Sequence, residues 1–112
     1  MNIESMAHEI SIARKASLEA GKTLANNKKA LNKATFESSK DIKLKADTSA
    51  ENLIKSILNK ESLFPILAEE SGKSVDDLGS TFWVVDPLDG TANYSRDIPI
   101  CCVSIALIKD LE

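Results

Sequence analysis

Cysteine, histidine and aromatic residues are scarce in this chain of 112 residues. Its two cysteines, Cys101 and Cys102, are neighbours, which excludes a disulfide framework and a zinc site built from four cysteines. Such sparing use of cysteine is typical of a reducing compartment, so we expect a cytoplasmic protein. The single histidine, His8, is remote in sequence from the acidic segments of the second half, and we interpret it as a surface residue of a helix.

Long apolar runs and an excess of positive charge are also absent. No run approaches the roughly 18–20 residues that a membrane-spanning helix needs, so we expect no membrane partner. The first ten residues lack the basic-then-apolar order of a secretory signal. A pI near 5.2 argues against nucleic acid as a partner, because phosphate backbones recruit basic patches. With 43% hydrophobic and 28% charged residues, the chain has the balance of a small globular domain or of a piece of one.

Two segments carry the periodicity of amphipathic helices. Residues 2 to about 30 place small and apolar side chains on one stripe, at Ile3, Met6, Ile10, Ala13, Ser17, Ala20 and Leu24, widened by Ala7, Ala16 and Ala25. Residues 48–51 (TSAE) fit a capping box, in which Thr48 and Glu51 satisfy amides at the start of a second helix. Its predicted buried face consists of Ala50, Leu53, Ile54, Ile57 and Leu58. Residues 32–46 between the helices indicate a polar connection with a short extended piece at 41–45.

Three apolar segments of the second half predict strands. Residues 65–68 and 82–85 each end directly in acids, the first at Glu69 and Glu70 and the second at Asp86. Residues 102–108 alternate apolar with small side chains, and residues 73–79 are interpreted as a loop. Helices that precede strands ending in carboxylates indicate a layered α/β arrangement.

The segment 86–91 (DPLDGT) carries most of the chemical information. Its two carboxylates lie three residues apart on a turn in which Pro87 fixes one backbone dihedral and Gly90 allows a positive one, so they can face one point. The Leu88 carbonyl lies between them. Hard oxygen ligands at a strand end suit Mg²⁺. The amides of Gly90 and Thr91 can point at an anion such as phosphate.

Each acidic feature also has a structural explanation. An ordinary type I turn would account for segment 86–91, and Glu69 and Glu70 would equally suit a solvated turn. Asp47 would be favourable beside a helix N-terminus by roughly 0.3–1 kcal/mol through the helix dipole alone. A functional role is favoured because these features occur together. Two neighbouring apolar strands both end in acids, and a glycine turn bearing Thr91 follows the second.

Residues 41–108 resemble the inositol monophosphatase family of magnesium-dependent, lithium-sensitive phosphomonoesterases. Segment 86–91 is similar to the first signature motif of that family, and residues 68–71 (AEES) are similar to the glutamate pair that precedes it. Residues 93–94 and 99–106 resemble the family segment on the C-terminal side of the motif. The resemblance implies a sugar-phosphatase-like, layered α+β fold within the α/β class, with N-terminal helices before the first strands of an open sheet. Residues 1–112 would form the N-terminal portion of such a domain, with its C-terminal half absent.

The resemblance also implies roles for individual residues. The implied metal ligands are Glu69, Asp86, the Leu88 carbonyl and Asp89. The implied catalytic residues are Asp47, Thr91 and Glu70. Thr91 would pair with Asp47 to orient the attacking water, Asp86 would bridge two magnesium ions, and Glu70 would support Glu69. The amides of Gly90 and Thr91 would hold the substrate phosphate.

The chain departs from the pattern of the family at two points. Family members are much longer, and their second half carries a further aspartate ligand that has no counterpart here; Leu44 stands where a threonine often precedes Asp47. The implied function is magnesium-dependent hydrolysis of a small phosphate monoester such as inositol monophosphate or another polyol or sugar phosphate, with a nucleotide 3′-phosphate as the alternative substrate. The alternatives from other classes are a non-catalytic metal-binding fragment and a scaffold that forms a homodimer through exposed strand edges.

Overall fold

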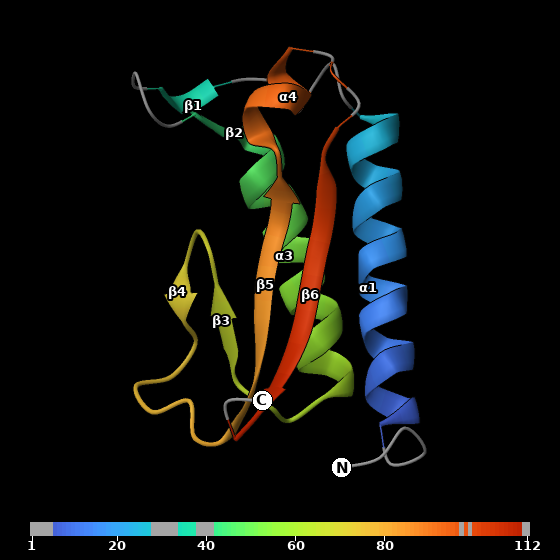
Figure 1. The fold of residues 1–112 in the computed structure, drawn as a ribbon, viewed down its shortest axis with the longest axis vertical. Coiled ribbons are helices and arrows are strands. Elements are labelled where there is room, and N and C mark those ends of the chain that lie inside the picture. The colour runs from blue at the N-terminus through green and yellow to red at the C-terminus, as the bar shows by residue number, and fades with distance from the viewer. Residues whose placement is uncertain (1–5, 28–33, 38–41, 97, 99, 111–112) are drawn as a thin grey trace.

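The computed structural model describes residues 6–27, 34–37, 42–96, 98 and 100–110. In chain order the elements are α1 (Ala7–Asn26), β1 (Ala34–Glu37), β2 (Ile42–Leu44), α3 (Lys45–Glu61), β3 (Ile66–Ala68), β4 (Gly72–Lys73), β5 (Thr81–Asp89), α4 (Thr91–Ser95) and β6 (Cys102–Lys109). The long helices α1 and α3 lie side by side on one face of a four-stranded sheet (Figure 1). This arrangement confirms the predicted layered α/β class. None of the helices within the described ranges is long and apolar enough to span a membrane.

The sheet has the strand order β4-β3-β5-β6. Strands β3 and β5 run parallel with Ala68 opposite Val85, whereas β4 and β6 pair antiparallel with their neighbours. Because β3 and β5 run parallel and Ala68 lies opposite Val85, Glu69 directly after β3 lies beside the Val85–Asp86 part of β5. The acidic ends of the two predicted strands therefore meet.

The core fills the space between the helix pair and the sheet. Its buried apolar side chains come from both layers and include Ile12, Ala16, Ala20, Leu24, Ala46, Ala50, Ile54, Leu58, Ile66, Ala68, Trp83 and Val85. Alanines on the facing sides of α1 and α3 allow the two helices to approach closely. The larger side chains of the sheet then fill the layer beneath them, as Trp83 does with 1% of its surface exposed.

The buried face of α1 differs from the predicted stripe. Ala20 and Leu24 are buried as expected, but Ile12 replaces Ile10 as the buried isoleucine, and Ile10 is 51% exposed. The helix is contacted by α3 on one side and by β6 on another. The face that carries Ala16 and Ala20 is the more deeply buried of the two. His8 is exposed, as predicted. The part of the prediction that concerns Ile3 lies outside the described residues.

The capping box predicted at residues 48–51 is wrong. Helix α3 begins at Lys45, and Leu44, four residues before Thr48, occupies the N-cap position in extended conformation. The carboxylate of Asp47 reaches back to accept the Leu44 N–H at 2.8 Å, as the acid at the third helical position of a capping box does for the N-cap amide. Thr48 is exposed inside the helix, and Glu51 is buried with a different partner.

The predicted buried face of α3 also needs correction. Ala50, Ile54 and Leu58 are at most 1% exposed, as the periodicity predicts. Leu53 and Ile57 are only half-buried, because the axis of burial passes through positions 46, 50, 54 and 58. The sequence pattern therefore made this face too wide.

The connections contain more regular structure than the sequence predicts. The extended piece expected near residues 41–45 is observed as β2, which pairs antiparallel with β1, a strand that was not predicted. The two-residue β4 occupies part of the expected turn and loop and pairs with β3. The short helix α4 begins at Thr91, the last residue of the DPLDGT segment.

Tyr94 connects α4 to the end of α1. Its ring is buried, and its hydroxyl donates a hydrogen bond to the Leu24 carbonyl at 2.8 Å, which is one of the carbonyls that a helix C-terminus leaves unpaired. Tyr94→Phe keeps the ring but orphans this carbonyl, so we expect a loss of about 1–2 kcal/mol in the free energy of unfolding, measured by urea denaturation. An unchanged denaturation midpoint would mean that water replaces the hydroxyl.

Candidate active site

The carboxylates of Glu69 and Asp86 meet at the end of the parallel strand pair. Ala68 lies opposite Val85 in the register, and the Glu69 N–H donates to the Val85 carbonyl at 3.0 Å, which continues the pairing by one step. The two side chains are close enough for the charge of Asp86 to act on Glu69. The structure thus brings together the two strand ends that the sequence analysis singled out.

The electrostatics of this pair favour a cation. Partial burial raises the pKa of Glu69 above its ordinary value of 4.5, and the negative charge of the nearby Asp86 raises it further. The charges of Glu70 and Asp47 act in the same direction. A carboxylate whose pKa is raised by a neighbouring negative charge is stabilised in the ionised form by a positive charge placed between the two groups.

Asp47 and Thr91 form a second pair beside the first. Asp47 is 3% exposed, and its Oδ1 accepts the Thr91 hydroxyl at 2.9 Å while its Oδ2 accepts the Leu44 N–H. The Thr91 Oγ1 also lies 3.1 Å from the Leu88 carbonyl, so its single proton has two acceptors to choose between. Burial raises the pKa of Asp47 and the charge of Asp86 adds to this, while the hydrogen bonds from Leu44 and Thr91 oppose it.

The leucine that replaces the family threonine is compatible with this geometry. Leu44 contributes its backbone N–H, and not its side chain, to the Asp47 carboxylate. Its side chain is 2% exposed and packs in the core. The departure from the family pattern therefore leaves the orientation of Asp47 supported.

The DPLDGT segment combines a strand end with a helix start. Strand β5 continues to Asp89, beyond the predicted strand, and the Leu88 N–H donates to Asp86 Oδ1 at 3.3 Å. Gly90 has a φ of +95° and is the N-cap of α4, so it adopts the positive dihedral that the sequence predicted. A Cβ on Gly90 would lie 2.7 Å from the Ile100 carbonyl oxygen. Only glycine fits this position, and the Gly90 and Thr91 backbone is fixed accordingly.

The Asp89 carboxylate lies beside β6. It is exposed, and its Oδ2 lies 3.9 Å from the Cys102 sulfur, which is its antiparallel partner in the register. Loss of hydration raises the pKa of Cys102, as do the charges of Asp89 and Asp86, so the thiol stays protonated near neutral pH. A hollow of about 490 Å³ adjoins this point and is lined by Asp89, Gly90, Asn93, Ile100, Cys101 and Cys102.

Sequence reasoning missed two residues of this site. Cys102 was interpreted only as a strand residue, and no local signal indicates its approach to Asp89. Glu51 was interpreted as part of a capping box, but it is 3% exposed and its Oε1 accepts the Glu70 N–H at 2.8 Å. The signal that could have found it is the spacing of four residues from Asp47, which places both acids on one helix face.

The donor set fits a hard divalent cation in part. Within the described ranges, no three His, Cys, Asp or Glu side chains converge closely enough to form a complete metal site. The structure does provide the Glu69–Asp86 pair, with the Leu88 carbonyl and Asp89 on the same turn as Asp86. Carboxylate and carbonyl oxygens are the ligands that Mg²⁺ prefers, and its charge would relieve the repulsion described above.

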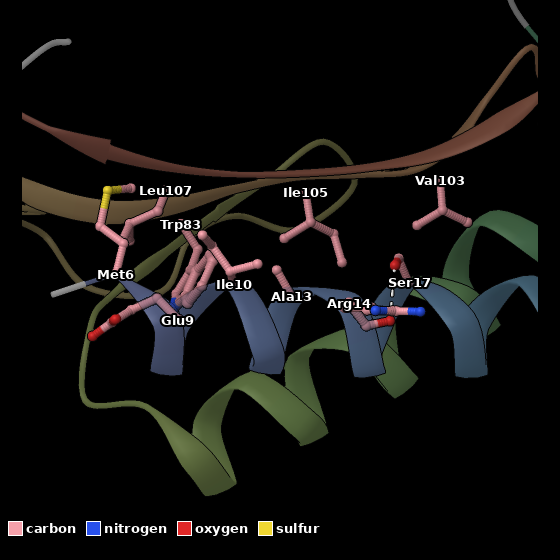
Figure 2. A pocket seen from close by; sticks show the side chains of 10 residues that line it. All are labelled: Met6, Glu9, Ile10, Ala13, Arg14, Ser17, Trp83, Val103, Ile105 and Leu107. Carbon is pink, nitrogen blue, oxygen red and sulfur yellow. Dashed lines mark hydrogen bonds between the residues drawn. The ribbon is translucent and has the colours of Figure 1, made fainter. Parts of the chain in front are cut away.

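A separate apolar hollow of about 440 Å³ lies between α1 and β6 (Figure 2). Ile10 and Ala13 of α1 face Ile105 and Leu107 of β6 across it. This explains why the predicted stripe of α1 is only partly buried, because its residues line this hollow. The hollow contains none of the acidic residues of the strand ends, so it is distinct from the candidate site.

Comparison with known proteins agrees with this geometry. A profile of the inositol monophosphatase family matches residues 3–112. The fructose-1,6-bisphosphatase/inositol-1-monophosphatase of Aquifex aeolicus is 34% identical over 116 residues, which cover 98% of this chain and 42% of the relative. The Nus factor SuhB of Salmonella typhimurium is 35% identical over 103 residues, which cover 88% of this chain and 38% of the relative.

A solved structure shows the same fold. The crystal structure of the extragenic suppressor protein suhB from Bartonella henselae matches with a TM-score of 0.83 and 31% identity, over 92% of this chain and 41% of that chain. The chain thus spans about two fifths of the length of these relatives. Because the family profile extends over nearly all of its residues, the chain belongs to the inositol monophosphatase family.

Proposed function

We propose that this chain carries the metal-binding and water-positioning part of a magnesium-dependent phosphomonoesterase site. Membership of the family supports metal-dependent phosphatase chemistry. The observation that carries the proposal is the juxtaposition of two pairs: Asp47 with Thr91 at 2.9 Å, and Glu69 with Asp86. The charge of Asp86 acts on both Asp47 and Glu69, which joins the two pairs in one electrostatic site.

Glu69, Asp86, the Leu88 carbonyl and Asp89 would hold magnesium in this proposal. When bound, the ion would neutralise the charge of the phosphate and make the attacking water more acidic. The residues themselves suit this role, because they present only oxygen donors. Glu70 follows Glu69 directly, and its backbone N–H is held by Glu51.

Thr91 and Asp47 would hold and move the proton of the attacking water. The Thr91 Oγ1 would accept that proton while its own hydroxyl proton passes to Asp47 Oδ1. Burial raises the pKa of Asp47, which brings its proton affinity closer to that of a general base acting near neutral pH. The amides of Gly90 and Thr91 would bind the phosphate, on a backbone whose shape only glycine permits.

The proposed substrate is a small polyol or sugar phosphate such as inositol monophosphate, with a nucleotide 3′-phosphate as the alternative. The name of the Aquifex aeolicus relative includes inositol-1-monophosphatase, which supports the first choice. The expected absence of a nucleic-acid partner stays a prediction, because another relative is named a Nus factor. The cytoplasmic location and the homodimer also stay predictions, and we propose that residues 1–112 form the N-terminal portion of the family domain.

The proposal is tested by measuring phosphate release from inositol 1-phosphate by this chain, with Mg²⁺ and with EDTA. We expect phosphate release to require Mg²⁺ and to be inhibited by added inorganic phosphate, which competes with the substrate for the site. Calorimetric titration with Mg²⁺ runs in parallel. A folded chain that binds Mg²⁺ without releasing phosphate would contradict the catalytic proposal and favour the alternative of a non-catalytic metal-binding module.

Thr91→Ala tests the Asp47–Thr91 pair separately from the Glu69–Asp86 pair. The substitution removes the hydroxyl that donates to Asp47 and leaves Glu69 and Asp86 unchanged. We expect phosphate release to fall by about 10²–10⁴-fold, the usual contribution of general acid–base catalysis, with Mg²⁺ affinity close to that of the original chain. Thr91→Ser keeps the hydroxyl and is the matched control. Equal activity in Thr91→Ala would assign proton transfer to another group.

A further inference from the structure

We infer that Glu51 is a positioning residue, which holds the Glu69–Glu70 turn where Glu69 faces Asp86. The inference rests on the proposed function, because it assigns Glu51 a part in preparing the metal site. In the hydrogen bonds of the described residues, the Glu51 carboxylate is bonded neither to the amides of Gly90 and Thr91 nor to the side chains of Asp47 and Thr91. Its effect would pass through the backbone of Glu70.

The backbone around Glu69 is held from two sides. Its own N–H donates to the Val85 carbonyl at 3.0 Å, as the last step of the β3–β5 pairing. The next N–H, of Glu70, has left that pairing and donates to Glu51 Oε1 at 2.8 Å. A carboxylate acceptor makes such a bond stronger than a neutral one. Glu51 therefore fixes the direction in which the chain turns directly after Glu69.

Helix α3 connects both halves of the site through one turn. Asp47 and Glu51 lie four residues apart, so they share a helix face. Asp47 accepts the Thr91 hydroxyl from the DPLDGT segment, and Glu51 accepts the Glu70 N–H from the other strand end. The relative placement of the two strand ends is thereby tied to a single rigid element.

The burial of Glu51 argues against a role in stability alone. Within the described ranges, Asp47 and Glu51 are the buried charged residues, each 3% exposed. The other buried positions of α3 carry apolar side chains, as at Ile54 and Leu58. Burying a carboxylate costs desolvation free energy that an apolar residue of similar size avoids. Both buried acids instead point their oxygens at the candidate site.

The test measures amide hydrogen exchange of Glu70 by NMR and binding of Mg²⁺ alone by calorimetry. Glu51→Met fills the space without accepting a hydrogen bond. We expect exchange at Glu70 to become about tenfold faster or more, beyond any change in global stability. We expect Mg²⁺ affinity to fall by about 10–100-fold, as when the outer partner of a metal ligand is removed. Glu51→Gln keeps an acceptor oxygen and is expected to restore slow exchange.

Two variants of the same helix serve as controls. Glu61→Gln removes an α3 carboxylate that pairs with Lys15 at 3.2 Å, away from the site. Ile54→Val reduces a fully buried side chain and reports the effect of lower stability alone. Neither is expected to change Glu70 exchange selectively or Mg²⁺ affinity. Glu51→Ala replaces Glu51→Met if the longer side chain prevents folding.

The outcomes distinguish this inference from the proposed function. Exchange at Glu70 and Mg²⁺ affinity that match the controls in Glu51→Met would overturn the positioning role, with the metal site intact. An original chain that binds no Mg²⁺ would overturn the proposed function, and the exchange rate of Glu70 would still decide whether Glu51 holds the turn. Faster exchange with weaker Mg²⁺ binding, both restored by Glu51→Gln, supports the inference.

Discussion

Asp86→Asn is expected to abolish Mg²⁺ binding and, in the absence of the ion, to stabilise the chain at neutral pH. The charge of Asp86 raises the pKa of both Glu69 and Asp47. Replacing it removes a ligand and the central repulsion together. We expect Mg²⁺ affinity to fall by more than the roughly 10–100-fold that loss of an outer partner causes, because Asp86 is itself a proposed ligand. Calorimetric titration measures this loss.

The stability change follows from the sign of the pKa shifts. In the folded chain the pKa values of Glu69 and Asp47 are raised above their ordinary values of 4.5 and 3.8, so both carboxylates bind protons more tightly than in the unfolded chain. The folded state therefore carries more protons in this range, so stability falls as pH rises from those values through the raised ones. Asp86→Asn lowers both pKa values, so its stability should fall less over the same range. Thermal unfolding between pH 4 and pH 8 with EDTA measures the difference.

Asp76→Asn is the matched control for this experiment. Asp76 is exposed in the loop before β5, so the substitution makes the same change of net charge away from the site. It should alter neither Mg²⁺ affinity nor the pH dependence of unfolding. Mg²⁺ affinity in Asp86→Asn equal to that of Asp76→Asn would remove Asp86 from the metal site. A site that destabilises the chain until its ion binds is typical of function maintained at the expense of stability.

The acidic strand ends were predictable because their signal is local. An apolar run followed at once by a carboxylate is visible in the sequence at Glu69 and at Asp86, and parallel pairing of β3 with β5 brings the two together. The positive φ of Gly90 was predictable for the same reason. The pairing of Asp47 with Thr91 joins residues 44 positions apart and came only from the family resemblance.

The parts that failed depend on contacts between elements. The stripe of α1 was misplaced because helix periodicity cannot tell which of two apolar faces packs more closely when α3 and β6 both contact the helix. The start of α3 was misplaced because residues 48–51 also fit the local pattern of a capping box. In the structure the Asp47 carboxylate, and not that of Glu51, accepts the N–H of the N-cap residue, which is Leu44. The approach of Cys102 to Asp89 depends on the β5–β6 register, which no local pattern sets.

Gly90→Ala is expected to lower the free energy of unfolding by about 2–5 kcal/mol. A left-handed conformation costs a residue with a Cβ about 1–2 kcal/mol, and forcing an extra carbon into a packed place costs about 1–3 kcal/mol more. Both apply here, because Gly90 has a φ of +95° and its Cβ would lie 2.7 Å from the Ile100 carbonyl oxygen and 3.1 Å from the Cys101 Cα. Urea denaturation measures the loss.

Two other glycines separate strain from crowding. Gly72 has a φ of +75°, and a Cβ added there would meet no atom within 4 Å, so Gly72→Ala should show the conformational cost of about 1–2 kcal/mol alone. Gly21 lies inside α1, where an added Cβ would also meet no atom within 4 Å, so Gly21→Ala should stabilise the chain by up to about 1 kcal/mol. If Gly90→Ala lowers the free energy of unfolding no more than Gly72→Ala does, the backbone at Ile100 moves to accommodate the added Cβ. The amides of Gly90 and Thr91 would then lack the rigid support that phosphate binding requires of them.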